Sequence, residues 1–286
     1  MLTRQIIETV VRAALVEDAP WGDLTSQLLI PGSAYATARL VAREPGTFAG
    51  GEVFAAAMTL TDPAITVELA VADGDEFAAG QTLATVAGPA RSVLQGERVA
   101  LNFTQRMSGI ATLTAAFVRE VAGTSARVVD TRKTTPGLRA FERHAVRAGG
   151  GHNHRYSLSD AVMAKDNHLA ILTAQSGLGV TEALLRVRAQ LSHTTHLEVE
   201  VDRIDQIEPV LAAGVDTIML DNFTLNELRE GVALVAGRAI VEASGNVSLQ
   251  TVRAIAETGV DVISSGALTH SVRSLDLGLD VVVEAP

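Results

Sequence analysis

The sequence predicts an α/β protein whose larger part is a parallel β/α barrel of about six strands. Three observations support this prediction. Short β-branched segments alternate with segments of helical spacing in the second half of the chain, the connections between them are short, and polar residues follow each expected strand. Such alternation gives parallel strands joined by right-handed crossovers. A doubly wound open sheet is the alternative, but no GxGxxG motif follows the first of these strands.

The first part of the chain is expected to mix helices and strands. Residues 1–17 carry charged side chains throughout an apolar pattern, which indicates an amphipathic helix and not a signal peptide. Residues 91–122 are expected to form a long helix, or a helix pair broken near Ser108-Gly109. The other elements expected here are strands at 36–43 and 64–71 and a helix at 51–60.

The second part of the chain is expected to hold the parallel strands, with helices between them at segments that include 181–190 and 205–213. The expected strands are 127–130, 161–165, 196–201, 216–220, 238–243 and 260–264. In parallel β/α folds, ligands bind where the strands end, so the polar residues after each strand are the candidate site.

Composition limits the class of protein. The 286 residues are 47% hydrophobic, which provides a large core and argues against disorder. The net charge of −10 argues against general nucleic-acid binding. The chain has no cysteine, and no apolar run approaches the ~18 residues of a membrane span. We therefore expect a soluble, cytoplasmic protein without disulfides or thiolate metal sites.

A basic segment interrupts this acidic chain. Residues 127–168 hold eight Lys or Arg against four Asp or Glu, so the segment is +4 and the remainder −14. It also holds both lysines of the chain, Lys133 and Lys165. Lysine is a compact point charge that the planar arginine fork does not replace geometrically. The segment therefore predicts a site that captures a small anion, although two lysines can also fall there by chance.

The cations of this segment cluster around two expected loops. Arg132 and Lys133 follow the first strand, and His154 and Arg155 follow a run of three glycines at 149–151. Arginine forks suit carboxylates. A solvated basic loop is the alternative for Arg132 and Lys133. The remaining arginines, Arg139, Arg143 and Arg147, recur at helical spacing and are expected to lie on a surface helix.

Acidic residues end the next strands. Glu198 and Glu200 alternate on one strand, and Asp221 ends the following one. Carboxylates without cysteine suit Mg²⁺, which takes one or two of them together with phosphate oxygens of a substrate. The sequence therefore predicts a Mg²⁺ subsite at Glu200 and Asp221, and a buried acid pair balanced by nearby cations is the alternative.

Serine and glycine turns follow the last two strands, where helices are expected to begin. N–H groups at such positions bind phosphate. The candidates are Ser244, Gly245, Asn246, Ser265 and Gly266. Three subsites therefore follow from the strand ends: one for carboxylates, one for Mg²⁺ and one for a monophosphate. An activated sugar phosphate and a carboxylated acceptor would use all three.

Segments throughout the chain resemble the quinolinate phosphoribosyltransferases. The segments are GERVALN (96–102), SGIAT (108–112), DTRKTTPGLRAFERHAV (130–146), GGGHNHR (149–155), AKDNH (164–168), EVEVD (198–202), MLDNF (219–223), EASGNVS (242–248) and TGVDVISSGALTHSVRSLDLGLD (258–280). They occur in the order of the family. The resemblance is therefore much more specific than a single motif.

The resemblance implies an N-terminal open α/β sandwich and a partial β/α barrel of six or seven strands. We expect an N-terminal domain at 1–109, a barrel at 110–270 and a C-terminal segment at 271–286 that packs back on the N-terminal domain. The resemblance also implies a homodimer or a larger multiple with shared active sites. The implied reaction converts quinolinate and 5-phosphoribosyl 1-pyrophosphate (PRPP) into nicotinate mononucleotide, pyrophosphate and CO₂, with Mg²⁺ as cofactor.

The resemblance also implies roles for particular residues. Positions matching Arg132, Lys133, His154, Arg155 and Lys165 surround the quinolinate carboxylates, and Arg98 reaches in from the other subunit. Glu200 and Asp221 match the Mg²⁺ and ribose side, and the catalytic residues would be Lys133, Lys165, Glu200 and Asp221. The 5-phosphate side would be formed by Ser244, Gly245, Asn246, Ser265 and Gly266, with His270 close by.

Two departures from the family pattern are Ala164, where a larger aliphatic residue is expected, and the pair Ser264-Ser265. Neither removes a charge. The alternatives are a phosphoribosyltransferase for nicotinate or another acid, a binding or accessory paralogue linked to molybdate transport, and an unrelated barrel isomerase or synthase. The molybdate-linked paralogues depart near the Lys-Asp-Asn-His segment, which this chain keeps at 165–168.

Overall fold

The computed structural model describes residues 2–282, and the chain divides into two compact units. Unit 1 comprises residues 1–115, 134–150 and 268–286, and unit 2 comprises residues 116–133 and 151–267. These units are defined by contacts within the chain. The domain boundaries expected from the sequence stay a prediction.

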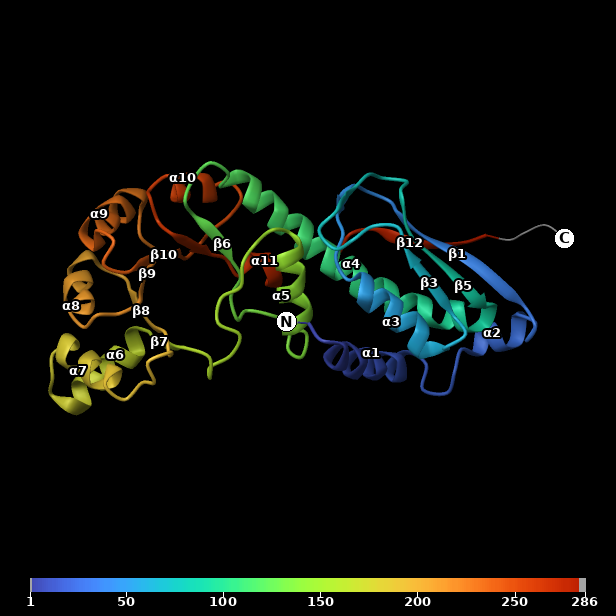
Figure 1. Cartoon of the computed structure of the whole chain (residues 1–286), viewed down its shortest axis with the longest axis horizontal. Coiled ribbons are helices and arrows are strands. Elements are labelled where there is room, and N and C mark those ends of the chain that lie inside the picture. The colour runs from blue at the N-terminus through green and yellow to red at the C-terminus, as the bar shows by residue number, and fades with distance from the viewer. Residues whose placement is uncertain (1, 283–286) are drawn as a thin grey trace. The chain divides into compact units, whose positions relative to one another are not determined.

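Unit 1 is built on an antiparallel sheet in the order β12-β1-β5-β3. Residues of β1 are alternately buried and accessible, as expected for a strand with one face on a core. The strands are β1 (Tyr35–Ala42), β3 (Thr66–Leu69), β5 (Thr82–Pro89) and β12 (Leu277–Val282), and β2 (Gly46–Thr47) and β4 (Glu76–Phe77) form a separate pair. Strand β12 lies beside β1 although the two are far apart in the sequence (Figure 1).

Helices complete unit 1. The expected N-terminal helix is α1 (Arg4–Asp18), whose buried residues Ile7 and Val11 lie on one face. It packs against α3 (Gly51–Thr61), which is also confirmed. Short helix α2 (Leu24–Leu29) begins at Asp23, whose carboxylate accepts the N–H groups of the first turn. Helix α5 (Arg139–Ala148) carries the three arginines expected on a helix.

Helix α4 (Ala90–Glu120) is continuous over 31 residues, so the expected long helix is confirmed and the alternative of a helix pair broken near Ser108-Gly109 is wrong. These two residues serve packing instead. Ser108 Oγ accepts the N–H of Ala49 at 3.1 Å. A side chain at Gly109 would overlap the carbonyl oxygen of Arg273. Glycine is therefore needed here for close approach of another backbone segment, and that approach is not visible in local sequence.

Unit 2 contains a six-stranded sheet in the order β6-β11-β10-β9-β8-β7, and every neighbouring pair is parallel. The strands are β6 (Arg127–Val129), β7 (Val162–Ala164), β8 (Leu197–Val201), β9 (Thr217–Asp221), β10 (Ile240–Ser244) and β11 (Val262–Ser264). All six lie where the sequence predicts them. Because β7 to β11 follow in sequence order without the reversal of a doubly wound sheet, the sheet is a partial β/α barrel.

The helices of unit 2 lie between these strands in the sequence. They are α6 (Asp166–Ser176), α7 (Val180–Arg188), α8 (Ile207–Leu211, preceded by a 3₁₀ turn), α9 (Leu225–Val235) and α10 (Val252–Ala256). Helices α8, α9 and α10 run along one side of the row of strands (Figure 1). The short helix α11 (Ala267–His270) follows β11. No helix in the described part of the chain has both the length and the apolar character needed to cross a membrane.

Replacing Gly109 by Ala tests the close packing of α4. Replacing an exposed helical glycine by alanine raises the free energy of unfolding by about 1 kcal/mol, whereas overpacking a buried site lowers it by about 1–3 kcal/mol. We predict a loss in the free energy of unfolding, measured by urea denaturation. Gly179→Ala is the control because nothing lies within 4 Å of the added carbon. A Gly109→Ala variant as stable as the parent would contradict the packing argument.

Candidate active site

The strand register gathers the expected acidic residues on one face of the parallel sheet. Glu200 of β8 pairs with Met219 of β9, which pairs with Glu242 of β10. Asp221 lies two residues after Met219 and therefore points to the same face. The side chains on this face near the strand ends are Glu198, Glu200, Asp221, Glu242 and Ser244. Their shared direction follows from the period-two alternation of strands.

Glu198 and Glu242 are buried, at 3% exposure each, and they face His154. His154 Nε2 lies 3.2 Å from Glu198 Oε2 and 3.5 Å from Glu242 Oε2. The ligand atoms of the three residues lie within 4.8 Å of one another. In the described part of the chain, the other oxygen of each glutamate is buried without a hydrogen-bond partner. This cluster therefore concentrates negative charge in a nearly dry environment.

The cluster holds protons strongly. Burial by itself would lower the pKa of His154, but the hydrogen bonds and charges of Glu198 and Glu242 outweigh it and raise the pKa to about 10. Burial raises the pKa of Glu198. The cluster therefore retains a proton, because losing it would leave two negative charges buried together.

The loop that carries His154 is fixed by Asp130 at the end of β6. Asp130 is fully buried, and its carboxylate accepts the Asn153 side-chain amide at 2.6 Å and the His154 N–H at 2.8 Å. His152 forms a parallel bridge with Val129 and so extends the sheet beyond β6. The triple-glycine segment therefore leads into an ordered strand-like loop.

Arg155 follows directly in this loop. Its guanidinium donates to the Ala161 carbonyl at 2.9 Å, and its backbone N–H donates to His154 Nδ1 at 2.7 Å. Burial and then the nearby Arg132 guanidinium lower the pKa of Arg155. The Arg132 guanidinium therefore lies near enough to Arg155 to act on it electrostatically. Lys133 is exposed in the same loop as Arg132, with its N–H donated to Thr131 Oγ1 at 3.1 Å.

Lys165 and Glu200 form an ion pair across neighbouring strands. Lys165 comes after β7, where it caps α6, and Glu200 lies on β8. The side chain of Lys165 is 47% exposed and that of Glu200 is 13% exposed, so the ammonium lies at the open side of the pair. This geometry places the second lysine of the chain beside the acidic strand ends.

Hydrogen bonds connect Asp221 and its neighbour Asn222 to the turn after β10. Asp221 accepts Ser244 Oγ at 2.5 Å and the Asn222 side-chain amide at 2.7 Å. Gly245 has a φ of +91°, and a side chain there would overlap Asn222. Asn246 donates to Asn222 Oδ1 at 3.2 Å. Glycine at 245 is therefore required both by backbone conformation and by space.

The two turns that are expected to bind phosphate differ in whether a helix follows them directly. Helix α11 begins directly after Gly266, as predicted, whereas α10 begins at Val252, six residues after Asn246. Ser265 is buried, and its N–H donates to the Val129 carbonyl at 3.1 Å. That N–H is used by the sheet and is not available to a ligand in this conformation.

Two expected site residues belong to unit 1. Arg98 is exposed on α4, and His270 is exposed at the end of α11, where its Nδ1 lies 2.6 Å from Ser271 Oγ. Arg98 forms no salt bridge with a described residue. The roles expected for both residues stay predictions.

The acidic strand ends fit Mg²⁺. Glu200 and Asp221 are partly accessible carboxylates on one face of neighbouring strands, and hard oxygen donors of this kind suit Mg²⁺ better than they suit soft metals. Two carboxylates leave several coordination positions for phosphate oxygens and water. The residues are therefore compatible with a substrate-borne Mg²⁺ ion.

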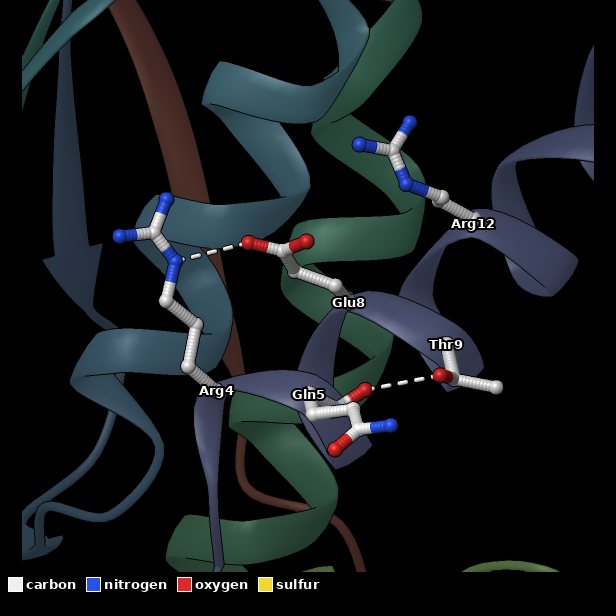
Figure 2. Close-up of a pocket in the computed structure, with 5 residues that line it drawn as sticks. All are labelled: Arg4, Gln5, Glu8, Thr9 and Arg12. Carbon is white, nitrogen blue, oxygen red and sulfur yellow. Dashed lines mark hydrogen bonds and ion pairs between the residues drawn. The ribbon is translucent and has the colours of Figure 1, made fainter.

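A surface pocket on α1 is a separate feature. Figure 2 shows its five lining residues, all from one helix: Arg4, Gln5, Glu8, Thr9 and Arg12. Arg4 and Glu8 form an ion pair of 2.7 Å one turn apart. Exposed pairs of this type contribute little free energy. The pocket contains none of the expected site residues.

Sequence analysis missed two functional candidates, Glu242 and Asp130. Glu242 alternates with Ser244 on β10, which was the available signal for its direction. Asp130 immediately follows β6, where it fixes the His154 loop. The structure thus adds a buried acidic layer beneath the predicted site.

The proton affinity of the His154 cluster predicts a pH dependence of stability. A pKa raised from 6.5 to about 10 contributes stability that is complete below pH 6.5 and is lost as the pH rises toward 10. We predict that the free energy of unfolding in urea falls over this interval. The isosteric double variant Glu198→Gln/Glu242→Gln should flatten the slope, and an unchanged slope in that variant would contradict the assignment.

Comparison with known proteins covers nearly the whole chain. Residues 23–108 match the family model "Quinolinate phosphoribosyl transferase, N-terminal domain", and residues 110–280 match "Quinolinate phosphoribosyl transferase, C-terminal domain". The probable nicotinate-nucleotide pyrophosphorylase (carboxylating) of Bacillus subtilis is 42% identical over 268 residues, which cover 94% of this chain and 91% of that protein.

Two further relatives agree. The nicotinate-nucleotide pyrophosphorylase (carboxylating) of Mycobacterium leprae is 43% identical over 280 residues, 95% of each chain. The crystal structure of NadC from Streptococcus pyogenes superposes with a TM-score of 0.92 at 41% identity and covers 99% of both chains. The chain therefore belongs to the quinolinate phosphoribosyl transferase family.

Proposed function

We propose that this protein transfers the phosphoribosyl group of PRPP to quinolinate and decarboxylates the product to nicotinate mononucleotide, a step of NAD biosynthesis in the cytoplasm. One observation carries the proposal. A single unit holds four cationic side chains on loops after β6 and β7, together with carboxylates at the ends of β8 and β9. The cations are Arg132, Lys133, Arg155 and Lys165. Nearly full-length relatives with this activity in their names support it.

Binding of quinolinate would use the cations. Its two carboxylates match arginine forks at Arg132 and Arg155 and the ammonium groups of Lys133 and Lys165. PRPP would bind along the acidic strand ends. Its 5-phosphate would be received by the turns at Ser244, Gly245, Asn246, Ser265 and Gly266, with His270 nearby. The Ser265 N–H already bonds to the Val129 carbonyl and its hydroxyl to the Val247 carbonyl, so Ser265 would have to exchange one of these bonds to donate to the phosphate.

Glu200 and Asp221 would hold Mg²⁺ through substrate oxygens and water. Bound Mg²⁺ neutralises charge on the departing pyrophosphate. The carboxylates of this chain would also face the ribose, where positive charge develops as pyrophosphate leaves, and fixed negative groups stabilise such charge. Lys165 pairs with Glu200, which would orient that carboxylate before the substrates arrive.

The quinolinate ring nitrogen, which accepts the phosphoribosyl group, would be positioned by binding and not activated by a base. Quinolinate held by its carboxylates directs the ring nitrogen at C1 of the ribose, and holding both reactants supplies much of the rate. Bond formation makes this nitrogen quaternary and positive. Its positive charge then stabilises the electron pair that stays on the adjacent ring carbon when the carboxylate departs as CO₂, and this carbon takes up a proton to give nicotinate mononucleotide. No covalent nucleophile is required.

A homodimer with shared sites is also proposed, because Arg98 lies about one turn along α4 from Gln95, which holds an exposed apolar segment in place. Arg91 and Gln95 lie on the same face of α4 as Arg98, and both hold α2 in place by hydrogen bonds. The patch has exposed fractions of 92% at Trp21, 69% at Leu24, 75% at Leu28 and 73% at Leu29. Contiguous exposed apolar residues mark association surfaces. A second copy of the chain that covers this patch would bring Arg98 of the first copy toward the active site of the second copy.

An assay of CO₂ release tests the proposed function directly. The purified protein should release CO₂ from carboxyl-labelled quinolinate only when PRPP and Mg²⁺ are both present. The molybdate-linked accessory role predicts no turnover. Absence of quinolinate turnover in a folded protein would overturn the proposal.

Replacing Lys133 by Arg tests the need for an ammonium. We predict a loss of about 10- to 100-fold in kcat/KM, the equivalent of one charge-assisted hydrogen bond. Arg229→Lys, an exchange of the same residue types on the exposed face of α9, should leave the kinetics unchanged. Near-parental activity of the Lys133→Arg variant would show that only the charge matters.

Mixing two inactive variants tests whether Arg98 acts in the partner's site. A dimer of one Arg98→Ala and one Lys133→Ala subunit would have one intact site and one doubly altered site. Random exchange of subunits should therefore restore about one quarter of the parental activity. If Arg98 serves the site of its own subunit, the mixture stays inactive.

A further inference from the structure

The cluster of His154, Glu198 and Glu242 contains more negative charge than the proposed reaction uses. Neither glutamate is among the residues expected to bind substrate. Both are 3% exposed, and each keeps one oxygen without a donor in the described part of the chain. Burying such groups costs several kcal/mol unless they are compensated, so their retention on the sheet requires a physical reason.

A metal ion is one possible compensation, because a histidine nitrogen and two carboxylate oxygens converge. The hydrogen bond to the other ring nitrogen, Nδ1, argues against a metal ion at this position. Arg155 N–H donates to His154 Nδ1 at 2.7 Å, so Nδ1 is the acceptor nitrogen of the neutral ring. A neutral ring then has its proton on Nε2, the nitrogen that faces the carboxylates, and a protonated Nε2 does not bind a metal.

Both ring nitrogens of His154 therefore have partners within the protein. Nε2–H points at Glu198 and Glu242, and Nδ1 receives the N–H of Arg155. The ring links the buried acids to the backbone of the next residue. Arg155 is held at a second point, where its guanidinium meets the Ala161 carbonyl. Rotation of the imidazole would release the Arg155 backbone.

We propose that Glu198 and Glu242 are positioning residues that clamp His154, and through it Arg155, in the orientation that receives the substrate carboxylate. The proposal rests on the proposed function. It assigns to His154 an indirect part in binding: its ring fixes the arginine that follows it. The two glutamates act from opposite sides of β9, because β8 and β10 are the neighbours of that strand in the sheet.

The tautomer of His154 distinguishes the clamp from a merely structural role of the two glutamates, because a structural role would not determine which ring nitrogen carries the proton. Nitrogen-15 NMR of histidine-labelled protein should show that His154, once the pH rises past its pKa of about 10 and the ring is neutral, keeps its proton on Nε2 and not on Nδ1. In the Glu198→Gln/Glu242→Gln variant the carboxylates are lost and the ring should exchange between tautomers. A ring protonated on Nδ1 alone, or one equivalent of metal in the purified protein by mass spectrometry, would overturn the clamp.

Kinetics of the same variants complete the test. The clamp predicts that KM for quinolinate rises about tenfold in the double variant while KM for PRPP stays within about twofold, because only Arg155 is displaced. Thermal melting verifies that the variants fold, and single Glu→Gln variants serve if the double variant does not. Glu208→Gln, which removes an exposed carboxylate paired with Arg238, should leave both KM values unchanged.

The outcomes separate the clamp from the proposed function. If the parental protein has no quinolinate activity, the proposed function fails, and the tautomer measurement still decides whether the clamp exists. If the parental protein is active but the variants keep the parental KM for quinolinate, the clamp fails and the function stands. Equal increases in both KM values would indicate general disruption of the site and would also overturn the clamp.

Discussion

Burial of negative charge on one face of the parallel sheet is the constraint on which the site depends. The register of β8, β9 and β10 sends four carboxylates to that face, and each one must be compensated. His154 compensates Glu198 and Glu242, Lys165 compensates Glu200, and Ser244 with Asn222 hydrogen-bonds Asp221. The surrounding loops are therefore held in place by the acids beneath them.

This arrangement explains how an acidic protein can bind two anions. Lys133 and Lys165 are exposed beyond the strand ends, whereas Glu198 and Glu242 are buried, so the solvent-facing layer is positive while the layer below it is negative. Lys165 shows the arrangement most clearly, with a half-exposed ammonium above a largely buried carboxylate. An incoming carboxylate or phosphate meets preorganised positive charge, which need not be reoriented during the reaction.

The sequence was sufficient for the features that depend on local patterns. Six β-branched segments predict the six parallel strands, and alternation predicts that Glu198 and Glu200 share a face. Features that depend on distant contacts were not predictable. The glycine at 109 has the local appearance of a helix break, but it makes room for the backbone near Arg273. Glu242 becomes significant only because the sheet order places it two strands from Glu198, facing His154.

The family resemblance and the structure give different information about the site. Matching segments predict which residues belong to the site, whereas the structure shows which of them hold one another. Arg155 is an example: the motif predicts that it lines the pocket, and the hydrogen bonds from its backbone and guanidinium show how it is oriented. The buried acids and Asp130 supply the rigid support that a binding side chain needs.

The central claim is that the cations form a pocket for two carboxylates. Comparing kcat/KM for quinolinate with that for nicotinate, which lacks one carboxylate, at saturating PRPP tests it most directly. A site built for two carboxylates leaves cations unpaired with nicotinate, so we predict a preference for quinolinate of at least about 10³-fold. Comparable efficiency with the two acids would contradict the account.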